Sequence, residues 1–184
     1  MTALSSVQLD TLPKSIAQFV AWRDRVATTP QGGAAAMVVA LLLYAGDKTL
    51  GEQCLAAAVD CARLEEGSGG YQGLRLHKTD QRLIESQLKT QGYLPRSYIK
   101  GATPANGYTL PAPPYLFEFS ANRYSGDPAL GPNKVFVACS GAASPRPVTL
   151  HRDEAGVWKA HEWSSLVVGI QFPVPDAARG PASS

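Results

Sequence analysis

The hydrophobic and polar positions of this chain follow two different periods, one in each half. Between Ser15 and Gln91, apolar residues recur at the three- and four-residue spacing that is typical of helices. From Tyr115 onward, apolar and polar residues alternate in short runs, which is the pattern of half-buried strands. The period changes at Gly92. The sequence therefore predicts a layer of helices followed by a sheet.

The helical half divides into four segments with recognisable beginnings and ends. Ser15 with Gln18, and Thr49 with Glu52, have the spacing of capping boxes, in which side chains satisfy the first free N–H groups of a helix. The glycine-rich segment 65–70 is predicted to be a break between the third and fourth helices. The predicted helices span residues 16–26, 34–45, 49–64 and 79–91. The second is apolar on every side, so we expect it at the centre of the helical layer.

The second half contains five candidate strands. They span residues 115–120, 134–139, 148–152, 157–161 and 165–172. The third and fourth read as a hairpin around the turn 153–156. Because the connections are too short for helical crossovers, the sheet is predicted to be antiparallel. The fold class is therefore α+β, with an N-terminal layer of about four helices packed on a C-terminal antiparallel sheet of about five strands.

The length of 184 residues fits a single domain. We expect this domain to occupy residues 1–175, with a helical part at 12–92, a loop at 93–114 and a sheet part at 115–172. Residues 176–184 are predicted to be a disordered tail. Hydrophobic residues make up 45% of the chain and charged residues 17%, which argues against a disordered protein.

The charge and composition of the chain argue against several kinds of partner and location. The formal net charge is only +2, so the chain offers little electrostatic drive for nucleic-acid binding, and we expect none. The longest near-apolar run, 34–45, is shorter than the roughly 20 residues that a membrane span needs. The N-terminus lacks the pattern of a secretory signal. With three cysteines and no paired spacing, a cytoplasmic protein with reduced thiols is expected.

The sequence contains none of the strong catalytic or cofactor-binding motifs. There is no phosphate-binding GxxxxGK[ST] loop, no HExxH, no CxxC and no GxSxG. Cys139, at the end of a predicted strand, has no histidine near it in the sequence and is interpreted as a buried thiol. We therefore expect no catalytic residue, no cofactor and no metal ligand. The oligomeric state stays open.

Two loops rich in glycine and proline are the strongest candidates for a contact surface. Twelve of the 14 prolines follow Gly92, and many of them lie in the loops 93–114 and 140–147. Cations, aromatic side chains and backbone donors in these loops could bind an anion or an acidic protein surface. The candidate binding residues are Arg96, Tyr98, Lys100, Tyr108 and Arg146. The alternative is that the loops only wrap the sheet, with the tyrosines as packing anchors.

The chain has three histidines, two of which belong to the predicted hairpin. His151 and His161 would lie near each other if the hairpin forms as expected, whereas His77 lies in the helical half. The histidine spacing is looser than is usual for a zinc site. A solvated hairpin with exposed imidazoles is therefore our interpretation, and a role in a site is the alternative.

Several blocks of the sequence resemble a known family. They read QGGAAAMVVALLLY, LPRSYIKGATPANGYTLPAPPY, SGAASPRPVTL and GVWKAHEWSSLVVGI. These blocks, from about Pro30 to Ile170, are similar to a family of uncharacterised bacterial proteins that carry a domain of unknown function. The resemblance implies a self-contained bacterial domain. It assigns no catalytic residue, because the family has no established activity.

These observations favour a non-enzymatic binding or interaction domain that contacts an anionic ligand or a protein partner through its two loops. The first alternative is an enzyme of small-molecule or nucleotide metabolism in which His151 or His161 acts as the general base. A third hypothesis is an adaptor that binds another bacterial protein.

Overall fold

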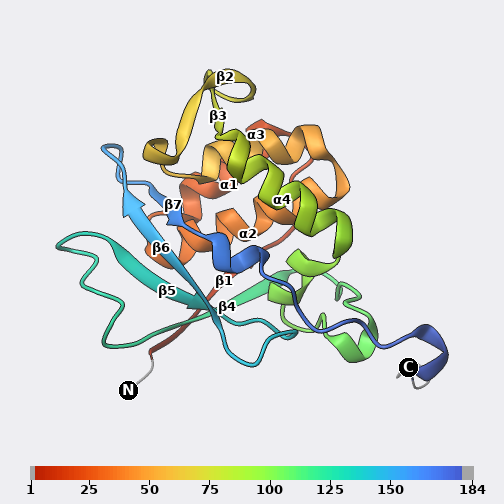
Figure 1. Ribbon diagram of the computed structural model, residues 1–184. Coiled ribbons are helices and arrows are strands. Elements are labelled where there is room, and N and C mark those ends of the chain that lie inside the picture. Colours follow the sequence, from red (N-terminus) through yellow and green to blue (C-terminus); the bar gives the residue numbers. More distant parts are fainter. Residues whose placement is uncertain (1–2, 180–184) are drawn as a thin grey trace.

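The α+β class is confirmed by a computed structural model that describes residues 3–179 (Figure 1). Four α-helices lie in the first half of the chain, and most of the strands of the main sheet lie in the second. The helices are α1 (Ile16–Val26), α2 (Pro30–Gly46), α3 (Lys48–Ala58) and α4 (Lys78–Thr90). The strands are β1 (Ala3–Leu9), β2 (Leu64–Tyr71), β3 (Leu74–Leu76), β4 (Tyr115–Ala121), β5 (Asn133–Val137), β6 (Arg146–Arg152) and β7 (Trp158–Glu162).

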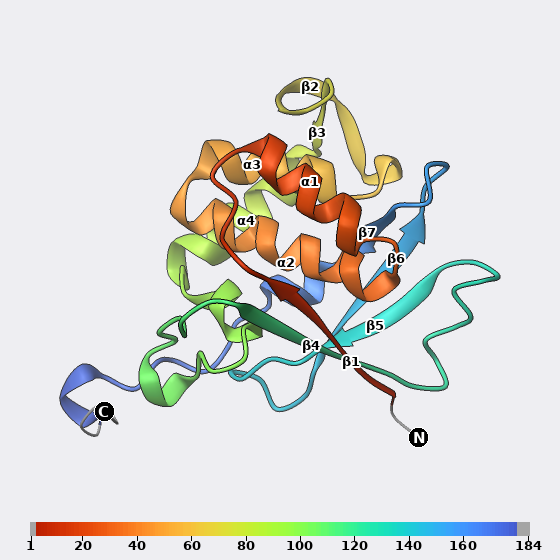
Figure 2. The ribbon, with the colours of Figure 1, turned by 180° about the vertical axis from the view of Figure 1, so that it is seen from behind.

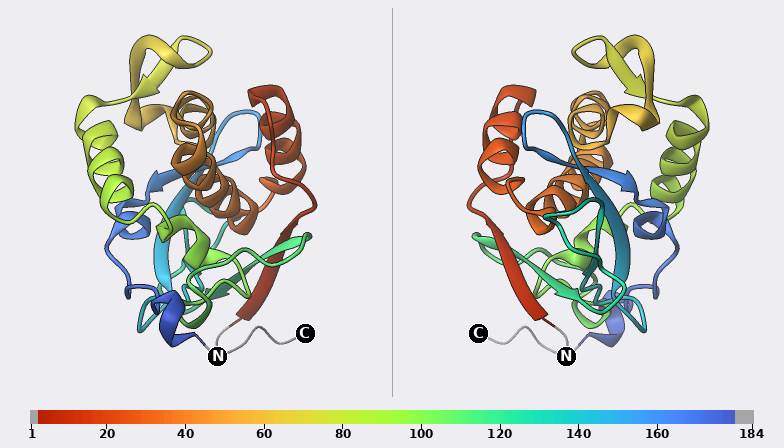
Figure 3. Two further views of the ribbon diagram at one scale, coloured as in Figure 1. Left: turned by 90° about the vertical axis from the view of Figure 1, so that its right-hand side faces the viewer. Right: turned by 90° about the vertical axis from the view of Figure 1, so that its left-hand side faces the viewer.

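Five of these strands form an antiparallel sheet in the order β1-β4-β5-β6-β7, and β2 pairs only with β3. Figure 2 shows β1 at one edge, beside β4, with the helices on one side of the sheet. The small β2–β3 hairpin projects from the helical side of the molecule (Figure 3). The sheet thus offers one face to the helices, and most side chains on its other face are half-buried.

Helix α2 lies at the centre of the core, as its apolar sequence predicts. Nearly every residue from Pro30 to Tyr44 is buried. The helix packs between the sheet and the other helices, with α1 and α4 on opposite sides of it (Figure 3). The sheet residues buried beneath the helical layer are Phe117, Phe119, Val135, Val137, Val148, Leu150, Trp158 and Ala160. Each large apolar side chain removed from water here contributes about 1.5–3 kcal/mol, so this contact dominates the stability of the fold.

The number of strands in the main sheet was predicted, but one of its members, β1, was not, and one predicted strand does not form. Strand β1 was missed because, of residues 4–9, only Val7 and Leu9 face the core, while Leu4 is exposed. Residues 165–172 were expected to form a strand, and this was wrong. Ser164–Val167 form a short 3₁₀ helix and the following residues are irregular. Leu166 and Val167 are consecutive and both buried, which a pleated strand facing a one-sided core cannot achieve.

The end of the third helix also differs from the prediction. Helix α3 ends at Ala58 instead of Leu64, and Asp47 caps its beginning in place of Thr49. The segment that was predicted to be a break forms β2. Between helix and strand, Asp60 extends beside the outer edge of β7, where its backbone N–H donates to the carbonyl oxygen of Ala160 at 2.8 Å. This short pairing fixes the position of Asp60.

The beginning of the predicted tail is folded. Residues Asp176–Ala178 form a 3₁₀ turn, and the Arg179 side chain donates a hydrogen bond to the carbonyl oxygen of Val174. The backbone N–H of Val174 in turn donates to the carbonyl of Pro104. The prediction of disorder was therefore wrong for 176–179, and the rest of the predicted tail lies outside the described residues. In the described part of the chain, no helix has the length and apolar character needed to cross a membrane.

A glycine allows α2 to approach strand β7 closely. A Cβ atom placed on Gly33 would lie 2.6 Å from the carbonyl oxygen of Trp158, well inside van der Waals contact. Gly46, at the other end of the same helix, has no atom within 4 Å of the equivalent position.

We expect Gly33→Ala to lower the free energy of unfolding by about 1–3 kcal/mol, because helix and strand must separate to admit the methyl group. Gly46→Ala is the matched control and should leave stability unchanged or raise it slightly, since alanine favours helix. Urea denaturation followed by circular dichroism measures both. Equal midpoints for the two variants would contradict the close approach.

Candidate functional site

The two loops that the sequence singled out do meet in the structure. The backbone N–H of Ser140 donates to the carbonyl of Ser97 at 2.9 Å, and the Ser140 hydroxyl donates to the carbonyl of Ala102 at 2.7 Å. The segment after the 3₁₀ helix at 164–167 joins them, since the N–H of Gln171 donates to the carbonyl of Gly141. The loops therefore form one packed region below the helices.

The two candidate tyrosines are buried within this region. The Tyr98 hydroxyl donates to the carbonyl of Leu166 at 2.7 Å, and the Tyr108 hydroxyl donates to the carbonyl of Gln171 at 2.6 Å. The Tyr108 ring stacks on Tyr93, with ring centroids 5.1 Å apart. Burial raises the pKa of Tyr98 strongly and that of Tyr108 to about 12, so both hydroxyls stay protonated as donors. These tyrosines anchor the loops, and Tyr98 also lines a surface cavity of about 250 Å³ together with Lys100.

The three candidate cations do not form a common surface. The Arg146 guanidinium donates hydrogen bonds to the carbonyls of Ser165, Val168 and Gly169 at 2.8, 2.9 and 3.1 Å. Lys100 lies 3.5 Å from Glu118, and both are exposed. The exposed Arg96 side chain makes no hydrogen bond or ion pair within residues 3–179. The candidate surface is thus divided between packing residues and separate exposed cations.

We expect Arg146→Ala to lower the free energy of unfolding by roughly 1–2 kcal/mol, because three backbone carbonyls lose a charged donor. A thermal melt should show a drop of several degrees. Arg96→Ala is the matched control and should leave the melting temperature unchanged. If both substitutions leave it unchanged, the bonds of Arg146 do not stabilise the fold.

A different group of side chains converges at the edge of the sheet. Asp60, His151 and His161, here called the Asp60 cluster, bring three metal-ligating atoms within 4.8 Å of one another. The Nδ1 atoms of His161 and His151 lie 2.8 Å and 3.2 Å from the same oxygen, Asp60 Oδ2. The two imidazole rings stack with centroids 3.9 Å apart and planes 7° from parallel. Both therefore present the same ring edge to one carboxylate.

A β-bulge positions His161. Leu150 pairs with Ala160 and Thr149 pairs with Glu162, so His161 is an extra residue on β7. A bulge bends the strand locally and redirects the side chain of the extra residue. His161 is thereby brought over the ring of His151, which extends from β6. Asp60 completes the group from the segment that follows α3.

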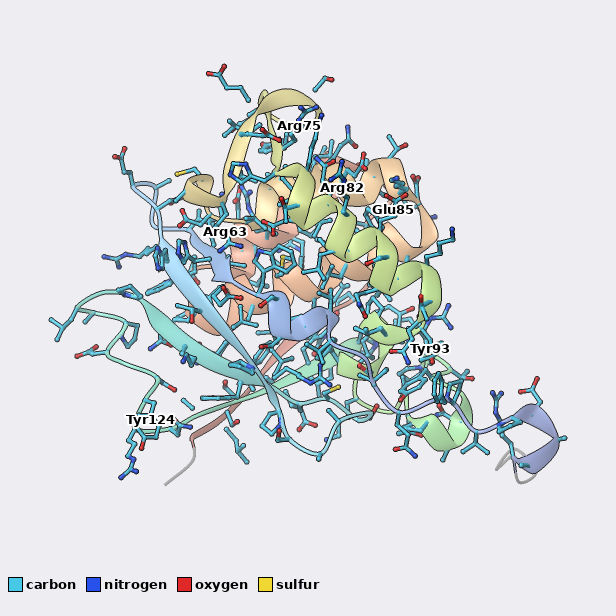
Figure 4. The ribbon with its side chains drawn as sticks, in the orientation of Figure 1. Arg63, Arg75, Arg82, Glu85, Tyr93 and Tyr124 are labelled. Carbon is cyan, nitrogen blue, oxygen red and sulfur yellow. The ribbon has the colours of Figure 1, made fainter. Side chains whose placement is uncertain are left out.

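The surroundings of the Asp60 cluster are polar and open. The His side chains are about one-third exposed, whereas the Asp60 side chain is 12% exposed. Arg63, which lies close to β7 in Figure 4, is 3.8 Å from Glu162 and 3.5 Å from Asp80. His151 also lines a surface cavity of about 310 Å³ together with Arg152 and Trp158. Small solutes can thus reach the imidazoles.

This arrangement supports two kinds of chemistry. The three atoms could bind a metal ion, because neighbouring ligands of a tetrahedral zinc ion lie about 3.3 Å apart when metal–ligand distances are about 2.0–2.1 Å. Alternatively, the Asp60 carboxylate could orient His161 as a proton acceptor, as in catalytic triads. His77 belongs to neither arrangement and lies 3.9 Å from Glu65.

The sequence indicated only part of this cluster. It predicted that the hairpin could bring His151 and His161 together, but it did not single out Asp60. Asp60 precedes the bulge residue His161 by 101 positions and stands in no motif. Only the pairing of its backbone with β7 places it there, and that pairing has no local sequence signal.

The fold and the cluster together define an α+β domain with a two-histidine, one-carboxylate group at the edge of its antiparallel sheet. The chain matches the family described as "Domain of unknown function (DUF6935)" over residues 11–174, and it belongs to that family. This confirms the resemblance to an uncharacterised family. No curated protein and no solved structure matches this chain.

Proposed function

We propose that this protein is a binding domain for a divalent transition-metal ion, held by the Asp60 cluster. The observation that supports this proposal is the convergence of two imidazole Nδ1 atoms, at 2.8 and 3.2 Å, on one carboxylate oxygen. Two like nitrogen atoms share a single oxygen here. A cation between the three atoms would satisfy all of them at once.

The ligand chemistry favours a first-row metal such as zinc. Imidazole nitrogens suit zinc, copper, iron and nickel, whereas calcium and magnesium prefer sites made of oxygen. Metal binding needs a small separation of each imidazole Nδ1 from Asp60 Oδ2, now 2.8 and 3.2 Å away, and a rotation of the two stacked rings, because an imidazole nitrogen binds a metal in the plane of its ring. Three protein ligands leave at least one coordination position open, as in catalytic and exchangeable sites. The partial exposure of both histidines lets water or a ligand occupy that position.

We expect zinc to bind the protein with one-to-one stoichiometry in isothermal titration calorimetry. Asp60→Asn and His161→Gln should each weaken binding more than about 10-fold, since even residues behind the metal ligands often contribute that much. His77→Gln is the matched control, because His77 is exposed and outside the cluster, and it should bind zinc like the parent. Affinity should also fall in acid, where protons compete for imidazole.

The same titration can contradict the proposal. If zinc, nickel and cobalt all fail to bind, or if they bind the Asp60→Asn variant as well as the parent, the cluster is not a metal site. The melting temperature gives an independent measurement. A ligand present at 100 times its dissociation constant stabilises by about 2.7 kcal/mol, and excess chelator should remove that stabilisation.

A second candidate function is general-base catalysis by His161. The 2.8 Å contact between its Nδ1 atom and Asp60 favours it, because a carboxylate in that place fixes the orientation of the ring. In this case the metal-free protein should hydrolyse an activated ester such as p-nitrophenyl acetate, and Asp60→Asn should lower the rate at least about 10-fold. Glu154→Gln, at an exposed turn residue, is the control. A rate equal to that of the uncatalysed reaction would exclude this candidate for such esters.

We further propose a cytoplasmic location and a bacterial origin. Three unpaired cysteines, Cys54, Cys61 and Cys139, support the location, because thiols stay reduced in the cytoplasm. Burial raises the pKa of Cys54 to about 12, which keeps it an unreactive thiol. The bacterial origin follows from the resemblance of the sequence blocks alone. A protein partner for the packed loops stays a prediction.

A further inference from the structure

A second candidate site lies beneath the β2–β3 hairpin, and it shares no residue with the Asp60 cluster. A cavity of about 140 Å³, here called the hairpin cavity, is enclosed by side chains from α2, α3, α4 and the hairpin. Pockets for drug-sized ligands have volumes of about 300–1,000 Å³, so this cavity fits only a small molecule. Figure 4 shows Arg75, a residue of β3 in the hairpin, near the beginning of α4.

The deep side of the hairpin cavity is apolar. Leu55 of α3, Leu76 of β3 and Ile84 of α4 line it, and these side chains are 1%, 4% and 0% exposed. Aliphatic side chains are the best contact for another aliphatic group. This side therefore favours a ligand with a short hydrocarbon part.

The other side of the cavity carries one anion and one cation. Glu52 and Arg75 both line it. A Cβ atom on Gly69 would lie 4.0 Å from Glu52 Oε2, which places this carboxylate close to Gly69 of β2. The Arg75 guanidinium packs against the backbone of Gly67, where a Cβ atom would lie 2.6 Å from Arg75 Cζ. The absence of a side chain at Gly67 makes room for the guanidinium.

The polar groups around the cavity are incompletely paired, since Arg75 forms an ion pair with Glu65 at 3.7 Å but no side-chain hydrogen bond. Arg75 Nε and Glu65 Oε1 are buried and 3.7 Å apart, too far for a hydrogen bond, and neither has another partner. In the part of the chain that the structure describes, the side chains of Tyr44, Glu52 and Ser68 make no hydrogen bond. Buried polar groups without a hydrogen bond are costly, so a ligand that accepts from the buried Arg75 Nε would gain free energy there, whereas water can reach the exposed Ser68 and the half-buried Glu52.

Tyr44 adds a hydroxyl donor to these groups. Burial raises the pKa of Tyr44, with the nearby Lys48 acting in the opposite direction, so the phenol stays protonated at neutral pH. The cavity thus combines a carboxylate, a guanidinium and hydroxyl groups with an aliphatic floor.

From this combination we infer that the hairpin cavity binds a free aliphatic amino acid. The ligand carboxylate pairs with the Arg75 guanidinium, whose planar fork suits carboxylates. The ligand ammonium group pairs with Glu52, and its side chain contacts the floor formed by Leu55, Leu76 and Ile84. A molecule without the ammonium group would leave Glu52 unpaired, and one without the carboxylate would leave Arg75 with only Glu65, 3.7 Å away.

The inference is tested by ¹H–¹⁵N NMR titration of the full chain with L-alanine, L-valine and L-leucine. At least one of them should cause saturable shifts at the backbone amides of Ser68, Gly69 and Ile84 below about 10 mM, tenfold above the upper range of typical substrate constants. Isovaleric acid, which lacks the amine, and isobutylamine, which lacks the carboxylate, should bind at least about 10-fold more weakly.

Substitutions that remove one charge from the cavity test whether the ligand binds there. Glu52→Gln and Arg75→Gln should each weaken amino-acid binding at least about 10-fold. Glu52→Gln should not change the binding of isovaleric acid, because that probe has no amine. Glu66→Gln on β2 and Arg82→Gln on α4 are the matched controls, since both residues are exposed and do not line the cavity. Arg75→Lys serves if Arg75→Gln lowers the melting temperature.

Three results would overturn the inference. They are the failure of all three amino acids to cause shifts, binding of isovaleric acid as strong as that of L-valine, and unchanged amino-acid binding in Glu52→Gln. Zinc affinity should be the same in all of these variants, because the Asp60 cluster is built from other residues. The two proposals can therefore fail independently.

Discussion

The burial of α2 between the sheet and the other helices is the contact on which the rest of the structure depends. A helix without a polar face is stable only when it is covered on all sides. The sheet covers one side, while α1, α3 and the 3₁₀ segment at 94–98 cover others. The close approach at Gly33 brings β7 against this helix. Because α2 fixes β7 and α3, it also fixes the frame in which Asp60 and the two histidines meet.

Both candidate sites lie where segments of irregular backbone join the helices and strands that pack around α2. The Asp60 cluster depends on two small departures from regular structure, the extension of Asp60 beside β7 and the bulge at His161. The hairpin cavity depends on Gly67 and Gly70 of β2, which let this strand pack closely against Arg75 and Leu74 of β3. In each case regular elements hold most of the polar side chains, and an irregular segment completes the group. The proline-rich loops have a structural role instead. Their tyrosines and Arg146 donate hydrogen bonds to backbone carbonyls, which stabilises the fold.

Much of the fold could be predicted from the sequence, and the reasons for the misses are physical. Helical periodicity and the Ser15 cap located α1, α2 and α4 within a few residues, because these signals are local. Strand β1 was missed because only one side of a short serine-containing segment faces the core. The sequence 165–172 was apolar enough for a strand, yet Arg146 and Gln91 hold its carbonyls and N–H groups outside the sheet. For the candidate site, the predicted hairpin indicated that His151 and His161 lie close together, but nothing in the sequence indicated that Asp60 joins them.

The sequence by itself determined the α+β class, the buried central helix, the β6–β7 hairpin and hence the proximity of His151 and His161. These features follow from the hydrophobic period and from turns, which involve neighbours along the chain. Only the tertiary structure decided that Asp60 joins the histidines, that Tyr98 and Tyr108 are buried, and that Glu52 and Arg75 line one cavity. These are contacts between residues far apart in sequence. They result from packing the whole core, and no local pattern encodes them.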